Sequence, residues 1–254
     1  MSNIFGIDVS HHNGVIDWKQ VKASGVKFAI LKCMYEAQSH RIDERFEANY
    51  KGCTENGIQT GVYIFIASAS IKDPVGDADA LLKHLKGRAL PLGIWLDYES
   101  GVLRSIGPER IRDLTKIYTQ KFRAAGYKVG IYCNKDWFDN VIHPDLKRDF
   151  KFWLARYPKN DIGQYNDSST LKPKMYECIA WQYSSKGKVP GIKTNTDLNV
   201  DFSGQLTTGK KSLEEIAVEV WADKWGKGEE RKNRLTAAGY DYESVRKIVN
   251  AKKP

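Results

Sequence analysis

The sequence predicts an α/β barrel followed by a small module of three helices. Over about the first 200 residues, short apolar runs alternate with amphipathic helical segments, which is typical of a barrel whose strands are covered by helices. Several runs are apolar on both faces, for example Lys27–Met34 and Leu92–Glu99, as expected for parallel strands that are buried on both sides. After Gly204 the chain becomes polar and then purely helical in pattern.

Eight runs are predicted to be strands because they are short, apolar and rich in β-branched and aromatic residues. In chain order they are Phe5–Val9, Lys27–Met34, Thr60–Ile66, Leu92–Glu99, Lys128–Cys133, Phe152–Tyr157, Ile179–Tyr183 and Thr196–Phe202. Helical segments separate the early strands. They are Asp17–Ser24, Asp43–Asn56, Asp73–Lys86, which opens with a favourable Asp-Pro pair, and Pro108–Ala125, which stops at Gly126. After Cys133 the helical patterns are short, so an incomplete outer ring is expected.

The tail follows a short polar linker. A capping box formed by Ser212 and Glu215 marks a helix start, and Gly239 marks a helix stop. The three amphipathic segments are Ser212–Lys224, Glu229–Ala238 and Tyr242–Asn250. We therefore predict a catalytic barrel over residues 1–204, a linker over 205–211 and a three-helix module over 212–254.

Composition restricts the function classes. The formal net charge of +9 predicts attraction to anionic polymers, which include bacterial walls, nucleic acids and membranes. No run approaches the ~20 apolar residues of a membrane span, and residues 1–10 lack the basic start and apolar core of a signal peptide. We therefore expect synthesis in a cytoplasm without a secretory signal. The cysteines form no CxxC pair, so we expect no metal site and four buried thiols: Cys33, Cys53, Cys133 and Cys178.

The strongest chemical feature is the pair of carboxylates at the end of the run GIWLDYE. Alternate residues of a strand share a face, so Asp97 and Glu99 point one way, whereas Leu96 and Tyr98 point the other. The end of a barrel strand is where barrel enzymes place their catalytic residues. Two close carboxyl groups raise each other's proton affinity, so one can act as an acid while the other stays charged.

Two further aspartates lie on the first and last predicted strands. If the barrel closes, Asp8 and Asp197 become neighbours and join Asp97 and Glu99 on one rim. Asp201 competes with Asp197 for this role, and Asp197 is preferred. Taken alone, an aspartate at a strand end is as often a turn or helix cap as a catalyst.

Aromatic and amide side chains near the same strand ends are candidates for sugar contacts, although core packing is an equally good interpretation of any one aromatic residue. The candidates are Tyr63, Trp95, Tyr98, Tyr132, Trp153, Tyr157, Trp181, Tyr183, Gln182 and Asn134. His11 and His12 have no third metal ligand at a usable spacing, so we expect one in a turn and one in contact with substrate.

Residues 4 to about 203 resemble glycoside hydrolase family 25, the muramidase-type lysozymes of phages and bacteria. The segments FGIDVSHHNGVIDW, GIWLDYE, FWLARY, IAWQYSSKGKVPGI and TDLNVDF carry the resemblance in order. It implies a flattened TIM-like barrel of eight strands with about five helices. It also implies cleavage of the β-1,4 bond from N-acetylmuramic acid to N-acetylglucosamine in peptidoglycan, without a cofactor.

The same resemblance implies a role for each carboxylate. Glu99 would be the general acid, Asp97 its partner, and Asp8 and Asp197 the other members of the catalytic set. The residues expected to contact the sugar are Tyr63, Tyr132, Trp153, Trp181 and Gln182. One departure lies at Tyr63-Ile64-Phe65, where the family more usually has a Tyr-His-Tyr pattern.

The tail resembles the "CW-seven" cell-wall-binding repeat through the core that begins at WGKGEERKNRL and continues to the end of the last helix. This resemblance implies three helices that bind a muropeptide, with Trp225, Arg231 and Tyr240 as contact candidates, although structural packing is the favoured interpretation of Trp225. A single repeat would bind weakly, so a homo-oligomer is an open alternative.

A phage endolysin of this kind is expected to collect in the host cytoplasm and to reach the wall through a membrane lesion made by another protein.

The sequence argues against three other functions. A chitinase-like barrel would extend the acidic motif to DxxDxDxE, but Leu92 and Trp95 occupy the earlier acidic positions. A catalytically inactive wall-binding protein would not need all four carboxylates, and a nucleic-acid binder would need a reader motif that is absent from the sequence. Retaining, inverting and substrate-assisted mechanisms all remain open from the residues, and the substrate-assisted route is preferred because Asp97 and Glu99 share one strand.

Overall fold

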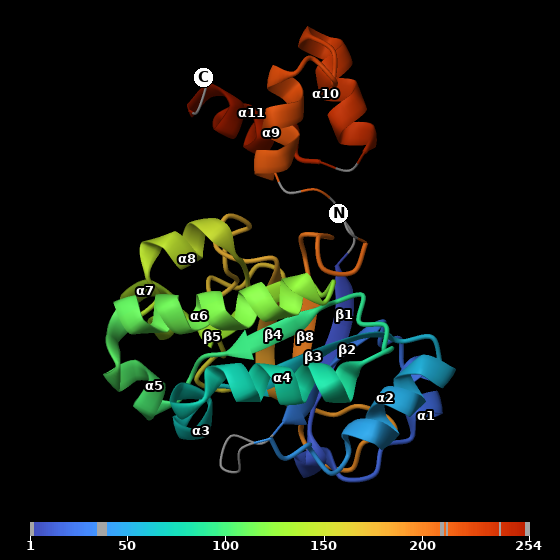
Figure 1. Cartoon of the computed structure of the whole chain (residues 1–254). Helices are drawn as coiled ribbons and strands as arrows, with labels where there is room; N and C mark the ends of the chain where they lie inside the picture. The colour runs from blue at the N-terminus through green and yellow to red at the C-terminus, as the bar shows by residue number, and fades with distance from the viewer. Residues whose placement is uncertain (1–2, 35–39, 209–210, 212, 239, 252–254) are drawn as a thin grey trace.

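The structure is a computed structural model, which describes residues 3–34, 40–208, 211, 213–238 and 240–251. Within these residues, eight strands close into one barrel in sequence order (Figure 1). They are β1 (Ile4–Val9), β2 (Phe28–Met34), β3 (Gln59–Phe65), β4 (Ile94–Asp97), β5 (Val129–Asn134), β6 (Lys151–Ala155), β7 (Ala180–Gly187) and β8 (Thr196–Asp201). The predicted eight-stranded α/β barrel is therefore confirmed.

The direction of β8 corrects the expectation of a parallel sheet. Strands β1 to β7 run parallel, whereas β8 is antiparallel to both β7 and β1. The connection between β7 and β8 contains only residues 188–195, and a crossover to a parallel strand needs about a dozen residues or more. The start of β8 therefore lies at the same rim as the ends of the other strands.

Helices cover the outer face of the barrel unevenly. The longest are α2 (Phe46–Glu55), α4 (Pro74–Leu85) and α6 (Gly107–Ala124). Five helices of five or six residues accompany them among the described barrel residues: α1 (Trp18–Ala23), α3 (Ser68–Lys72), α5 (Gly101–Ser105), α7 (Lys135–Asn140) and α8 (Pro144–Asp149). The segment 156–179, between β6 and β7, contains no helix. The outer ring is thus incomplete in its second half, as predicted.

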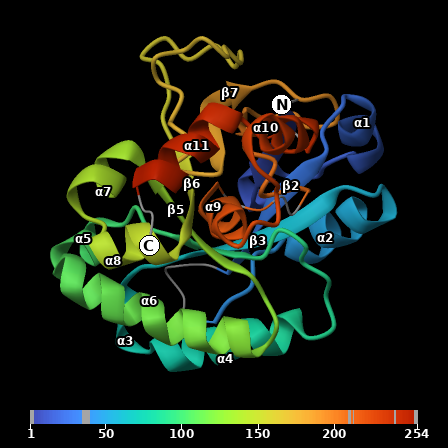
Figure 2. The ribbon, with the colours of Figure 1, turned by 90° about the horizontal axis from the view of Figure 1, so that it is seen from above.

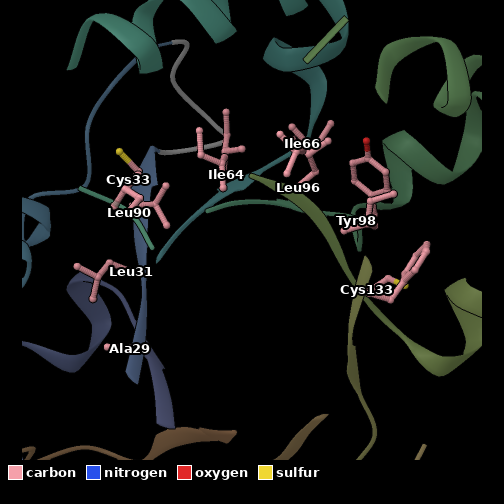
Figure 3. Close-up of a cluster of buried hydrophobic side chains, with 14 of the residues drawn as sticks. Ala29, Leu31, Cys33, Ile64, Ile66, Leu90, Leu96, Tyr98 and Cys133 are labelled. Atoms are coloured by element: carbon pink, nitrogen blue, oxygen red, sulfur yellow. The ribbon is translucent and has the colours of Figure 1, made fainter. Parts of the chain in front are cut away.

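Apolar side chains form two layers, one inside the barrel and one between the strands and the helices. Phe28, Trp95 and Trp153 belong to the inner layer, where the two indole rings make an edge-to-face contact at 5.9 Å. Leu96 and Tyr98 belong to the outer layer. Figure 3 shows both pointing away from the barrel interior. The two faces predicted for the run GIWLDYE are therefore confirmed.

The four cysteines are free and buried, as predicted. Burial is the main cause that raises the pKa of each thiol above its ordinary value. They therefore stay protonated at neutral pH and pack as small apolar groups.

The tail folds into the three predicted helices, α9 (Leu213–Trp221), α10 (Gly228–Ala237) and α11 (Tyr242–Ala251), which lie together in Figures 1 and 2. Their small core is formed by Ile216, Val220, Leu235 and Val245. The predicted helix cap Ser212 and helix stop Gly239 lie outside the described residues. None of the helices in the described part of the chain is long and apolar enough to cross a membrane.

The chain leaves the barrel at the end opposite to Asp8. Asp201, the last residue of β8, pairs with Ile4 at the start of β1 and is completely buried. Its carboxylate accepts hydrogen bonds from the backbone and hydroxyl groups of Ser203 and Thr207 and from the backbone of Gly204. Asp201 is therefore an anchor for the start of the linker, and it lies away from the rim that holds Asp197.

Candidate active site

The structure brings the four predicted carboxylates together at one rim of the barrel. Asp8 lies near the end of β1, directly opposite Asp197 in the pairing of β1 with β8. Asp97 ends β4, and Glu99 follows it by two residues. All four line a pocket of about 80 Å³ that also contains Tyr63, Tyr132, Trp153 and Gln182. The pocket is small, polar and acidic.

Asp8 and Asp197 form a hydrogen-bonded pair of carboxyl groups. Burial is the main cause that raises the pKa of Asp8 well above its ordinary value, and the charge of Asp197 adds to the shift. Burial also raises the pKa of Asp197, to about 6, with a further contribution from the charge of Asp161. Because two adjacent carboxylates repel each other, the pair retains one proton in weakly acidic solution.

Two amide side chains orient this pair. Gln182 Nε2 donates to Asp8 Oδ2 at 2.7 Å, and Asn199 Nδ2 donates to the same oxygen at 2.8 Å. The amide oxygens are held in turn: Gln182 Oε1 accepts from the hydroxyls of Tyr132, at 2.7 Å, and Tyr157, while Asn199 Oδ1 accepts from Trp153 Nε1 at 2.8 Å. Each amide therefore has its donor side directed at Asp8.

Sequence reasoning missed Asn199, although a signal was present. Asn199 lies two residues after Asp197 on β8, so it shares the inward face of that strand. It is completely buried. Its two contacts, to Asp8 and Trp153, link the carboxyl pair to the aromatic floor of the pocket.

Asp97 and Glu99, the two carboxylates at the end of the run GIWLDYE, differ in exposure. Asp97 is 4% exposed, whereas Glu99 is exposed beyond the end of β4. Between them, Tyr98 points outward, where its hydroxyl lies 2.7 Å from Thr115 Oγ1 on α6. This buried contact holds the end of β4, so Asp97 and Glu99 remain on the pocket side.

Four of the five predicted sugar-contact residues line the pocket, and Trp181 does not. Tyr63, Tyr132, Trp153 and Gln182 belong to the lining. Trp181 precedes Gln182 on β7 and therefore faces outward, where it packs against Tyr165 and Tyr183. Strand alternation therefore places Trp181 in the outer layer and not in this pocket, and a sugar contact by Trp181 stays a prediction.

His11 and His12 lie in a short 3-10 helix (His11–Asn13) that follows β1. His11 Nδ1 lies 2.8 Å from Asp43 Oδ2, and the His11 backbone donates to the same oxygen at 3.1 Å. Asp43 is buried and comes from the segment before α2. Sequence reasoning did not identify Asp43, since nothing in its local pattern relates it to His11.

The contact candidates in the tail take part in its packing. Trp225 Nε1 donates to Glu219 at 3.0 Å, and its ring meets that of Tyr240 edge to face at 5.9 Å. Arg231 Nε donates to the backbone oxygen of Gly226 at 2.8 Å. The favoured structural interpretation of Trp225 agrees with these contacts, while wall binding by the three residues stays a prediction.

Comparison with known proteins gives matches to both parts of the chain. The family model of glycosyl hydrolases family 25 matches residues 7–192, and that of the CW_7 repeat matches residues 214–252. The chain is 27% identical over 213 residues to Lysozyme M1 of Streptomyces globisporus, which covers 80% of this chain and 69% of that protein. It is 34% identical over 158 residues to the lysozyme of Streptococcus phage Cp-7, which covers 61% of this chain and 44% of that protein. The solved bacterial lysozyme from Streptomyces coelicolor is 26% identical with a TM-score of 0.60, over 78% of this chain and 92% of that one.

Proposed function

The chain belongs to glycosyl hydrolases family 25 and carries a CW_7 repeat; from this premise we propose that it hydrolyses the β-1,4 bond from N-acetylmuramic acid to N-acetylglucosamine, with Glu99 as the general acid and Asp97 assisting. The observation that carries the proposal is the convergence of Asp8, Asp97, Glu99 and Asp197 on one polar pocket. A glycosidase needs a proton donor and a second carboxyl group beside the scissile bond.

Exposure selects Glu99 as the acid among these four groups. The leaving glycosidic oxygen belongs to a polymer that approaches from solvent, and Glu99 is the exposed carboxyl group of the pocket. Asp97 lies deeper, on the same face of β4. Asp8, which accepts from two amides, shares a proton with Asp197, so this pair sets the charge beneath the sugar.

Substitution of the acid tests this assignment. Glu99→Gln should fold normally and lose activity by about 10²–10⁴-fold, the usual contribution of a positioned acid. Glu55→Gln, at the exposed end of α2, is a matched control that should keep full activity. Wall digestion followed by identification of the new reducing end checks the bond cleaved, because muramic acid supports the proposal and glucosamine contradicts it. Near-normal turnover of Glu99→Gln would show that Glu99 is not the general acid.

We further propose that the substrate's own N-acetyl group attacks the anomeric carbon. Asp97 would orient and stabilise that group while Glu99 protonates the leaving oxygen. Glu99 and Asp97 approach the sugar from one strand, so neither lies on the opposite side of the bond, where a carboxylate nucleophile would be needed.

The route predicts retention at the anomeric carbon and a large loss of turnover for Asp97→Asn. Walls with de-N-acetylated muramic acid should be cleaved poorly, while re-acetylation of the same walls should restore cleavage. An inverted product in an NMR time course, or efficient cleavage of the de-N-acetylated walls, would contradict this route. One of the aspartates would then be the nucleophile or the base.

We also propose that the protein acts as a phage endolysin. It would accumulate in the host cytoplasm and reach the wall after another protein makes a lesion in the membrane. The similarity to a phage lysozyme supports this role. Cells that express the protein alone should stay intact until their membrane is permeabilised, and rapid lysis on expression alone would contradict the proposal.

A further inference from the structure

The irregular segment between β6 and β7 is fastened to β7 by one carboxylate. Asp161 Oδ1 accepts from Ser184 Oγ at 2.6 Å and from the backbone of Gly163 at 3.0 Å. Its other oxygen accepts from the backbone of Ser185 at 2.8 Å and from the hydroxyl of Ser185 at 3.4 Å. Three of the four donors therefore belong to β7.

The hydrogen bonds from Ser184 and Ser185 to Asp161 form a clamp, which lies where β7 departs from regular pairing with β8. The register between β7 and β8 shifts on both sides of Ser184, which leaves the strand irregular at Ser184 and Ser185. The segment approaches β7 closely, since a Cβ atom on Gly163 would lie 2.8 Å from the backbone oxygen of Lys186, and the φ of Gly163 is +75°. Asp161 supplies acceptors for an irregular strand, as a neighbouring strand would for a regular one.

Two pocket residues, Gln182 and Asp197, lie close to Ser184, the first along β7 and the second across the pairing with β8. Gln182, which donates to Asp8, lies two residues before Ser184 on β7. Ser184 is the pairing partner of Leu198, the residue after Asp197 on β8. We propose that Asp161 is a positioning residue of this site, which holds β7 so that Gln182 stays on Asp8 and places a fixed negative charge beside Asp197. The inference rests on the proposed function, because turnover of peptidoglycan is one of its readouts.

The charge of Asp161 has a defined effect on Asp197. Asp8 lies opposite Asp197 in the pairing of β1 with β8, while Tyr157, just after β6, and Asp161, in the following segment, interact with Asp197 through their charges. The remaining titratable groups of the pocket are Tyr63, Asp97, Glu99 and Tyr132. Because the charge of Asp161 raises the pKa of Asp197, its removal should lower that pKa. One limb of the pH–activity profile is the pH range in which activity changes as the Asp8–Asp197 pair loses its shared proton. This limb should then move to lower pH.

The test compares Asp161→Asn with Asp167→Asn. Asp167 lies in the same segment and accepts from Asn3, Tyr165 and Lys172, none of which belongs to β7. For Asp161→Asn we expect the limb to shift down by a few tenths of a pH unit or more, and kcat to fall about tenfold or more through misplacement of Gln182, with a smaller change in KM. Asp167→Asn should keep the wild-type profile. An unshifted profile for Asp161→Asn, or an equal shift for Asp167→Asn, would overturn the proposal.

Ser184→Ala separates the clamp from the charge and keeps the proposal testable if Asp161→Asn does not fold. It removes the 2.6 Å hydrogen bond but leaves both carboxylates, so kcat should fall without a shift of the limb. Wild-type kcat for this variant would overturn the positioning role. If the wild-type protein itself does not cleave peptidoglycan, the proposed function fails instead. NMR titration of the Asp197 carboxyl group in wild type and Asp161→Asn still tests the charge effect in that case.

Discussion

At the scale of single residues, the site depends on where amide groups point. Asp8 is buried, and a buried carboxylate is costly unless it receives hydrogen bonds. Gln182 and Asn199 both donate to one oxygen of Asp8, so its other oxygen is available to share a proton with Asp197. Tyr132 and Trp153 fix the amides, so aromatic residues expected to stack on sugars also orient the carboxyl pair.

The buried carboxyl pair predicts a pH-dependent loss of stability. The pKa of Asp197 in the folded protein, about 6, exceeds its ordinary value of 3.8, so the folded state binds the proton more tightly than the unfolded state. This contribution is fully present below the unfolded pKa and is lost as pH rises through about 6. Asp197→Asn should therefore raise the free energy of unfolding at neutral pH relative to wild type, on the order of 1–3 kcal/mol, while activity falls.

Urea denaturation at about pH 4 and about pH 7.5 measures this difference. Asp167→Asn serves as the control of opposite sign, because hydrogen bonds from Lys172 and Tyr165 lower the pKa of Asp167 to about 2. A wild-type protein whose stability relative to Asp197→Asn is the same at both pH values would contradict the assignment of a raised pKa.

At the scale of elements, the inner layer of the barrel requires close approach between neighbouring strands. Gly130 on β5 pairs with Trp95 on β4, and a Cβ atom on Gly130 would lie 2.4 Å from the Trp95 ring. Trp95 in turn contacts Trp153 on β6. The packing of three adjacent strands thus depends on the absence of a side chain at one position.

Gly130→Ala should therefore destabilise the barrel, by about 1–3 kcal/mol, as is usual for an overpacked core. Gly101→Ala is the matched control, since Gly101 begins α5 and a Cβ atom there would meet no atom within 4 Å. The control should be neutral or slightly stabilising, because alanine favours a helix. Chemical denaturation of both variants measures the difference, and equal stabilities would show that Trp95 moves without cost.

At the scale of the whole molecule, the antiparallel direction of β8 separates the tail from the pocket. Asp197 begins β8 at the rim with Asp8, whereas Asp201 ends it beside Ile4 at the other end of the barrel. The linker therefore starts opposite the pocket, and the tail helices lie beyond that end in Figure 1. A wall-binding tail attached there leaves the approach to the pocket open.

A chain that ends at Thr208 should retain the barrel, since Thr207 completes the hydrogen bonds to Asp201. It should cleave soluble wall fragments like the full chain but bind intact walls less well, because a second site raises the effective concentration. Sedimentation with purified walls measures the binding, and molar mass in solution tests the homo-oligomer alternative. A chain that ends at Ser203 is the contrasting control and should be less stable. Unchanged wall affinity after truncation at Thr208 would refute the binding role of the tail.

The sequence by itself determined the local features of this protein. Strand alternation placed Asp97 and Glu99 on one face, and helix signals located α4 and α6. The change to a polar and then helical sequence pattern after Gly204 located the three-helix tail. These inferences succeed because periodicity and capping act over a few residues along the chain. The family resemblance added the flattened, eight-stranded form of the barrel and a role for each of the four carboxylates.

Only the tertiary structure decided which residues meet across the barrel. Closure and register place Asp8 opposite Asp197, direct Gln182 and Asn199 at Asp8, and bring Asp161 onto β7. The antiparallel direction of β8 likewise follows from the pairing of strands. Such contacts join positions far apart in the chain, so no local pattern in the sequence encodes them.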